Sequence, residues 1–118
     1  MDAKRVAQFQ ELIALEPNDT MLRFGLGELY IDARDFARAA EQFAEIVRLD
    51  PQYSAAYRYL GQSYAALDKR SEAVEVFTRG IAIAEGRGDL QTAKEMQVFL
   101  RRLDQNPSEQ KSAKKRGD

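Results

Sequence analysis

The sequence predicts an all-α fold in which antiparallel helix pairs stack side by side as an α-solenoid. Apolar residues recur at helical spacing along nearly the whole chain, and the breaks fall where Pro, Gly, Asp and Asn cluster. The chain also repeats itself after 34 residues, because Gly27 and Tyr30 recur as Gly61 and Tyr64. Such a period indicates stacked units, each unable to bury its apolar face alone. No strand pattern competes, since sustained alternation and an Asn-Gly hairpin turn are both missing.

The N-terminal part of the chain should hold one helix followed by a complete helix pair. We expect the first helix over residues 1–16, ending before Pro17 because the residue before a proline is pushed out of helical geometry. The first repeat unit follows over residues 18–51. Either Asn18 or Asp19 has the short polar side chain that caps a helix N-terminus, so one of them should start the first helix of this unit.

The second half of the chain follows the same plan. Asp35 should cap the second helix of the first unit. Residues 52–86 form the second unit, whose first helix runs over about residues 54–67, and a closing helix is expected over residues 89–104 after a glycine-containing break. The last segment, residues 106–118, has almost no apolar residue and several lysines, so we expect a disordered basic tail.

Composition narrows the class of function. With 44% hydrophobic and 31% charged residues in a chain of 118, a single globular domain over residues 1–105 is expected. Cysteine and histidine are both absent, which removes disulfides, Cys/His zinc sites, the thiol nucleophile and the commonest general base. We therefore expect no enzyme and no cofactor. No signal peptide or membrane span is visible, and a cytoplasmic setting is predicted.

The repeated positions carry a specific pattern of side chains. They are Leu26, Gly27, Tyr30, Ala39, Phe43 and Pro51 in the first unit, and Tyr57, Leu60, Gly61, Tyr64, Ala73 and Phe77 in the second. This pattern resembles the tetratricopeptide repeat, a 34-residue antiparallel helix pair. Two positions depart from it: Arg23 stands in place of the bulky aromatic of the first unit, and Glu85 in place of the closing proline of the second.

The two ends of the chain resemble incomplete units of the same family. Phe9 and Pro17 match the second half of a unit whose first half is absent. Lys94 and Glu95 stand where the period asks for Leu and Gly, which is typical of a polar capping helix. The resemblance therefore implies a right-handed solenoid of six helices: two full units, an N-terminal half unit and a capping helix. The chain as a whole is similar to small stand-alone bacterial proteins of this family.

In this family the first helix of each pair lines a concave surface, and the resemblance implies that partners bind there. Outward positions on these helices include aromatic and methionine side chains, which suit an extended peptide or an amphipathic helix. Arg58 is expected to pair with an acidic group of the partner. The candidate groove residues are Met21, Phe24, Glu28 and Asp32 on the first such helix, Arg58, Tyr59, Gln62 and Ala66 on the second, and Thr92, Met96 and Phe99 on the closing helix.

One group within the family grips the C-terminal carboxylate of heat-shock chaperones with Lys, Asn and Arg side chains on these same surfaces. Here Phe24 and Glu28 stand where that group has its first Lys and Asn. Asp89 and Ala93 stand where it has a later Lys and Arg. We therefore do not expect a carboxylate clamp.

The leading hypothesis is an adaptor that binds a peptide or helix of an unidentified protein partner. An alternative is a homo-oligomeric structural module, most simply a homodimer, because the first helix lacks a partner helix and exposes part of its apolar face. That face carries Val6, Phe9, Leu12 and Ile13. No membrane or nucleic-acid partner is expected, although the basic tail leaves weak nucleic-acid contact open, through Lys111, Lys114, Lys115 and Arg116.

Overall fold

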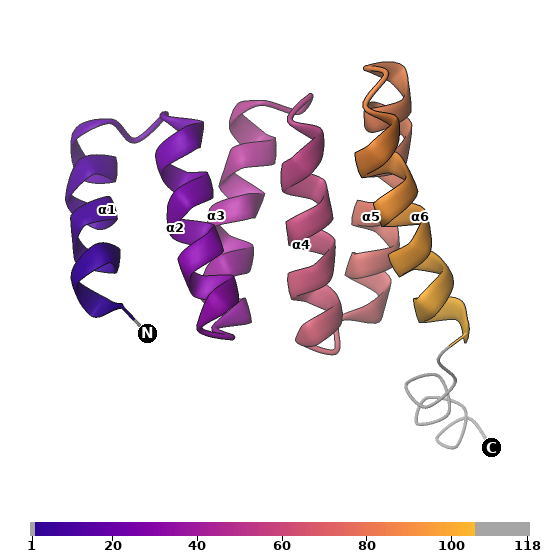
Figure 1. Cartoon of the computed structure of the whole chain (residues 1–118), viewed down its shortest axis with the longest axis horizontal. Helices are drawn as coiled ribbons and strands as arrows, with labels where there is room; N and C mark the ends of the chain where they lie inside the picture. The colour runs from indigo at the N-terminus through magenta and orange to yellow at the C-terminus, as the bar shows by residue number, and fades with distance from the viewer. Residues whose placement is uncertain (1, 106–118) are drawn as a thin grey trace.

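The structure is a computed structural model that describes residues 2–105, and all regular structure in that range is α-helical. The expected tail over residues 106–118 lies outside the described residues. The helices are α1 (Ala3–Leu15), α2 (Thr20–Asp32), α3 (Phe36–Leu49), α4 (Ser54–Ala66), α5 (Arg70–Gly86) and α6 (Leu90–Gln105). Figure 1 shows them as a row in which each helix lies beside the next and runs in the opposite direction. The predicted all-α solenoid is confirmed.

Contacts between helices follow the repeat. Helices α2 and α3 form one pair, α4 and α5 form the next, and each helix also packs on its successor. Helix α6 packs on α5 and also on α4, so α4 and α6 belong to one layer while α5 lies in the other. In Figure 1, α3 and α5 recede behind α2, α4 and α6. The first helices of the pairs therefore share a surface, as the resemblance implied.

Aspartate side chains start most of the helices. The carboxylate of Asp19 accepts a hydrogen bond from the backbone N–H of Leu22 at 3.1 Å, and that of Asp35 accepts one from Arg38 N–H at 3.3 Å. Both caps were expected, and of the two alternatives for α2 the structure uses Asp19. Asp2 caps α1 in the same way, by accepting from the backbone N–H of Arg5 at 3.1 Å.

The turns inside the helix pairs use left-handed backbone at repeated positions. Arg34 has φ 59° and Asp68, which stands 34 residues later, has φ 63°. Gly88, with φ 78°, makes the corresponding turn before α6. Because the same turn geometry recurs, each pair closes at a similar angle, and the first helices line up on one side.

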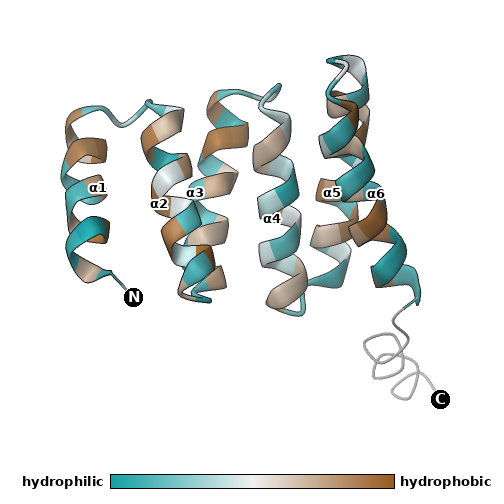
Figure 2. Ribbon diagram, in the orientation of Figure 1, coloured by the Kyte–Doolittle hydropathy of each residue, from teal (hydrophilic) through white to brown (hydrophobic). Residues whose placement is uncertain are grey.

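The core consists of two clusters of buried residues that are joined by shared, partly buried neighbours such as Val47 and Tyr64. One contains Leu26, Tyr30 and Phe43 from the first pair, and it reaches α1 through Val6. The other is centred on Phe77, Tyr57 and Met96, and joins the second pair to α6. Figure 2 shows hydrophobic and hydrophilic residues alternating along every helix, so each helix has a buried side and a solvated side. No helix among the described residues is long and apolar enough to cross a membrane.

Candidate peptide-binding face

The candidate groove residues fall into three groups by exposure. Met21, Glu28, Asp32 and Ala66 are exposed. Phe24, Arg58, Tyr59, Gln62, Thr92 and Phe99 are half-buried, which leaves part of each side chain open to a partner. Met96 is fully buried. All of them lie on α2, α4 and α6, the helices that form one layer of the solenoid.

Aromatic rings connect the first and second units beneath this face. The ring of Phe24 lies edge-on to Phe43, with centroids 5.3 Å apart, and stacks on Tyr53 at 5.5 Å. The Tyr59 ring stacks on Phe43 at 5.1 Å and lies edge-on to Phe24 at 5.4 Å. Phe24 and Tyr59 are therefore partly core residues and only partly groove residues. Tyr53 belongs to the same cluster and was not predicted from the sequence.

Arg58 is held in place by neighbours within the chain. Its guanidinium carbon lies 4.9 Å from the centroid of the Tyr59 ring and 5.8 Å from that of Phe99. Its Nε is 3.3 Å from a carboxylate oxygen of Glu95 on α6, and the two side chains are 26% and 36% exposed. The sequence predicted that Arg58 pairs with an acidic group of a partner. In the structure, Arg58 already has an acidic neighbour within the chain, Glu95.

Two buried polar atoms here lack a hydrogen-bond partner among the described residues, and one of them is Nε of Arg58 itself. Oε1 of Gln62 is buried and accepts no hydrogen bond from any described residue. A buried acceptor without a donor is unfavourable, so this oxygen lowers stability as it stands. A donor from outside could reach it only if the Gln62 side chain turned toward the surface.

Met96 is wrongly placed in the predicted groove. It has no exposed surface, and its sulfur lies against Gly80, 2.7 Å from where a Cβ on that glycine would stand. Gly80 of α5 occupies the position that Ile46 holds one unit earlier. Because the glycine has no side chain, the space that an isoleucine would fill is taken by Tyr57 of α4 and by the methionine of the following helix. The change from Ile46 to Gly80 is a signal in the sequence that would have predicted this burial.

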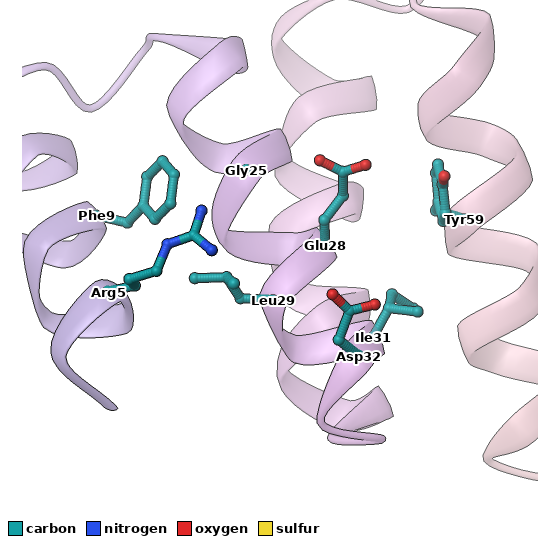
Figure 3. A pocket seen from close by; sticks show the side chains of 8 residues that line it. All are labelled: Arg5, Phe9, Gly25, Glu28, Leu29, Ile31, Asp32 and Tyr59. Carbon is teal, nitrogen blue, oxygen red and sulfur yellow. The ribbon is translucent and has the colours of Figure 1, made fainter. Parts of the chain in front are cut away.

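A groove lies where α1, α2 and α4 face one another (Figure 3). It has a volume of about 320 Å³ and is lined by Arg5, Phe9, Gly25, Glu28, Leu29, Ile31, Asp32 and Tyr59. Figure 3 shows the carboxylates of Glu28 and Asp32 on the side of α2 that faces Tyr59, while Arg5 and Phe9 approach from α1. Three residues predicted from the sequence thus share a groove with two from α1 that were not predicted.

The missed contribution of Arg5 had a signal in the repeat. Arg5 stands where the two complete units have the small, fully buried residues Ala39 and Ala73. Those alanines let the first helix of each unit pack closely on the second. Since the half unit lacks its first helix, a long charged side chain fits at this position and points into the open space.

The environment of this face shifts the pKa of Tyr53. Burial raises the pKa of the Tyr53 phenol, and the nearby negative charges of Glu28 and Asp50 raise it further. Glu28 therefore projects a field across the gap between α2 and α4. Among the described residues, no cluster of acidic side chains is arranged to hold a metal ion.

Comparison with known proteins agrees with this geometry. The family model for the Tetratricopeptide repeat matches residues 6–54 and 24–89. A TPR repeat-containing protein of Pseudomonas aeruginosa is 42% identical over 95 residues, which cover 80% of this chain and 90% of the relative. A Bordetella parapertussis protein solved in solution is 33% identical with a TM-score of 0.75, over 87% of this chain and 90% of that chain.

A more distant solved structure shares the fold alone. The TPR2B domain of yeast Sti1, solved as a complex with pHsp70, is 17% identical with a TM-score of 0.79, over 86% of this chain and 81% of that chain. The family model and the Pseudomonas relative together cover most of the described helices. This chain belongs to the tetratricopeptide repeat family.

Proposed function

We propose that this protein is a non-catalytic adaptor of the cytoplasm that binds a peptide segment of a partner protein on the face formed by α2, α4 and α6. The observation that carries the proposal is the preorganised Arg58, stacked against Tyr59 and Phe99 next to the unpaired acceptor of Gln62. Partly exposed aromatic rings beside a fixed arginine are typical of binding hot spots, since little conformational entropy is lost when a partner covers them.

The relative with pHsp70 in its complex supports the general mode of binding. That domain has the same fold, and it was solved with a partner bound. The chemistry of its ligand does not transfer to this chain, because Phe24 and Glu28 replace the Lys and Asn expected of a carboxylate clamp. The proposed ligand is therefore a peptide held along its length rather than by a terminal carboxylate.

The test needs variants that change the face without removing the core. Truncating Phe24 and Tyr59 would remove rings that pack on Phe43, so loss of binding in such variants would have two explanations. The double substitution Arg58→Ala/Gln62→Ala leaves these rings in place and removes two half-buried polar side chains of the face. The matched control is Arg38→Ala/Glu41→Ala on α3, where both side chains are exposed.

Binding peptides are first selected by the parent protein from a random 12-residue library displayed on phage. The affinities of the selected peptides are then measured by fluorescence anisotropy. We expect the Arg58/Gln62 variant to lose on the order of tenfold in affinity, and the control to keep the parent value. Failure to select any peptide, or equal binding by both variants, would refute the proposal.

Self-association is a second candidate function with its own observation. Five large hydrophobic side chains of the described residues are exposed, and three of them, Leu12, Leu15 and Met21, lie close together in sequence around the α1–α2 loop. Apolar surface concentrated at one end of a solenoid is typical of a contact between two copies.

Sedimentation velocity at high micromolar concentration tests this second candidate. A dimer should disappear in Leu12→Lys/Leu15→Lys and persist in Leu90→Lys, a control in which an exposed leucine at the opposite end is changed. A parent protein that sediments as a monomer would exclude self-association as the function.

A further inference from the structure

The groove between α1, α2 and α4 combines an apolar base with an acidic edge (Figure 3). Phe9 and Leu29 supply half-buried apolar surface on the α1 side of α2, and the carboxylates of Glu28 and Asp32 lie on the side of α2 that faces α4. The volume of about 320 Å³ is large enough for one long side chain of a partner. The groove is thus amphipathic, with its acidic groups on the α4 side and the guanidinium of Arg5 on the α1 side.

The two carboxylates share the groove with one basic side chain, Arg5, but are not paired with it. Both side chains are exposed, and neither makes an ion pair with any residue between positions 2 and 105. They stand four residues apart on α2, where two like charges repel each other and weaken the helix slightly. A cation placed between them would relieve this repulsion.

The repeat itself shows that the fold does not require these carboxylates. One unit later their positions are held by Gln62 and Ala66, which are neutral. The second unit stacks equally well without acidic side chains there, since its glycine, tyrosine and phenylalanine positions are the same as in the first unit. The negative charge is therefore a local property of the first unit and is independent of how the helices pack.

From this combination we infer that the groove binds a lysine or arginine side chain of the partner's peptide. The aliphatic stem of such a residue would lie along Phe9 and Leu29 while its charged head reaches Glu28 and Asp32, which matches the amphipathic character of the groove. Arg5 repels cations from the α1 side of the groove, so the charged head binds on the opposite side, next to the two carboxylates. An acidic side chain is repelled by the two carboxylates.

The inference rests on the proposed function, because it names the chemistry of the peptide that the face would hold. It is tested with the same library of displayed 12-residue peptides. Peptides selected by the parent protein should be enriched in one Lys or Arg. Replacing that residue by norleucine should lower the affinity on the order of tenfold.

Variants of the protein supply the matching half of the experiment. Glu28→Gln/Asp32→Asn should bind the basic peptides on the order of tenfold more weakly, and should bind the norleucine peptides as well as the parent does. The control Glu72→Gln/Glu75→Gln changes net charge equally, at two exposed residues of α5, and should bind like the parent. The charge-reversed Glu28→Lys/Asp32→Lys should instead prefer the same peptides with Glu in place of the basic residue.

The outcomes separate this inference from the proposed function. Peptides that need Arg58 and Gln62 but carry no basic residue would overturn the inference and leave the adaptor function standing. An equal loss in the α5 control would also overturn it, because the effect would then come from net charge alone. If no peptide binds the face, both proposals fail.

Discussion

Gly27 of α2 lies directly against the ring of Phe43 of α3. A Cβ built on this glycine would stand 2.6 Å from Cζ of the ring, closer than side-chain carbons approach in proteins. Gly61 and Phe77 repeat the contact one unit later. The two helices of each pair can approach this closely because one presents bare backbone to the aromatic ring of the other.

Substituting Gly27 by alanine should destabilise the protein by about 1–2 kcal/mol. The extra methyl group forces a fully buried ring to move, which costs about 1–3 kcal/mol, and the better helix propensity of alanine offsets up to about 1 kcal/mol. Urea denaturation measures the difference. Gly86→Ala is the control, since a Cβ there meets nothing within 4 Å and should leave stability unchanged or raised. Equal effects at both glycines would contradict the packing argument.

A second contact fixes the capping helix to the stack. The hydroxyl of Ser54 on α4 donates to a carboxylate oxygen of Asp89 at 2.7 Å, and the other oxygen of Asp89 accepts from the backbone N–H of Thr92 at 3.4 Å. Asp89→Ala should lower the free energy of unfolding by about 2 kcal/mol, because it removes both a helix cap and a tertiary hydrogen bond. Thermal denaturation measures this, with Asp2→Ala, a cap at an exposed end, expected to lose less.

The same aspartate should make stability depend on pH. The hydrogen bond from Ser54, together with those from Thr92, lowers the pKa of the Asp89 carboxyl below its ordinary value. A lowered pKa in the folded state contributes stability above the unfolded pKa of about 3.9, and this stability is lost as the pH falls through the folded value. The difference in stability between parent and Asp89→Asn should therefore be constant near pH 6 and shrink below about pH 4. A difference that stays constant down to pH 2.5 would exclude this role.

The helices and caps were predictable because they depend on local chemistry. Asp35 caps α3 and Pro17 ends α1 through contacts within a few residues. The 34-residue period identified Gly27 and Phe43 as repeated positions, although not their contact with each other. The groove was less predictable, because it depends on where the period breaks. Gly80 in place of an isoleucine draws Met96 into the core, and no property of Met96 itself signals this.

The groove lined by Glu28 and Asp32 was also only partly predictable from the sequence. Glu28 and Asp32 were predicted to face outward and do so. Their neighbours Arg5 and Phe9 come from the half unit, whose missing first helix leaves space that the period alone does not describe. Such places appear where a residue differs in kind from its equivalents 34 residues later. Arg5 is equivalent to Ala39 and Ala73, and this difference marks where the packing changes.

Phe24 and Glu28, one turn apart on α2, should respond differently to substitution. Phe24→Ala removes a ring that contacts Phe43, Tyr53 and Tyr59, and should destabilise the protein by about 2–4 kcal/mol. Glu28→Gln changes an exposed side chain without an ion pair, and should change stability by less than about 0.5 kcal/mol. Chemical denaturation of both variants separates core from groove. A large loss in Glu28→Gln would show that this carboxylate is structural.

The ion pair between Arg58 and Glu95 joins α4 to the capping helix across the candidate face. Both side chains are partly exposed, so a double-mutant cycle with Arg58→Ala and Glu95→Ala should give a coupling energy of about 0.5 kcal/mol, reduced further by 0.5 M salt. Arg58→Ala alone should lose more than the coupling, because its guanidinium also stacks on Tyr59 and Phe99. A coupling energy above about 2 kcal/mol would mean that the ion pair contributes strongly to holding α4 and α6 together. Under the proposed function, a weak coupling would let a carboxylate of the peptide replace Glu95 at Arg58 while the rings still hold the arginine in position.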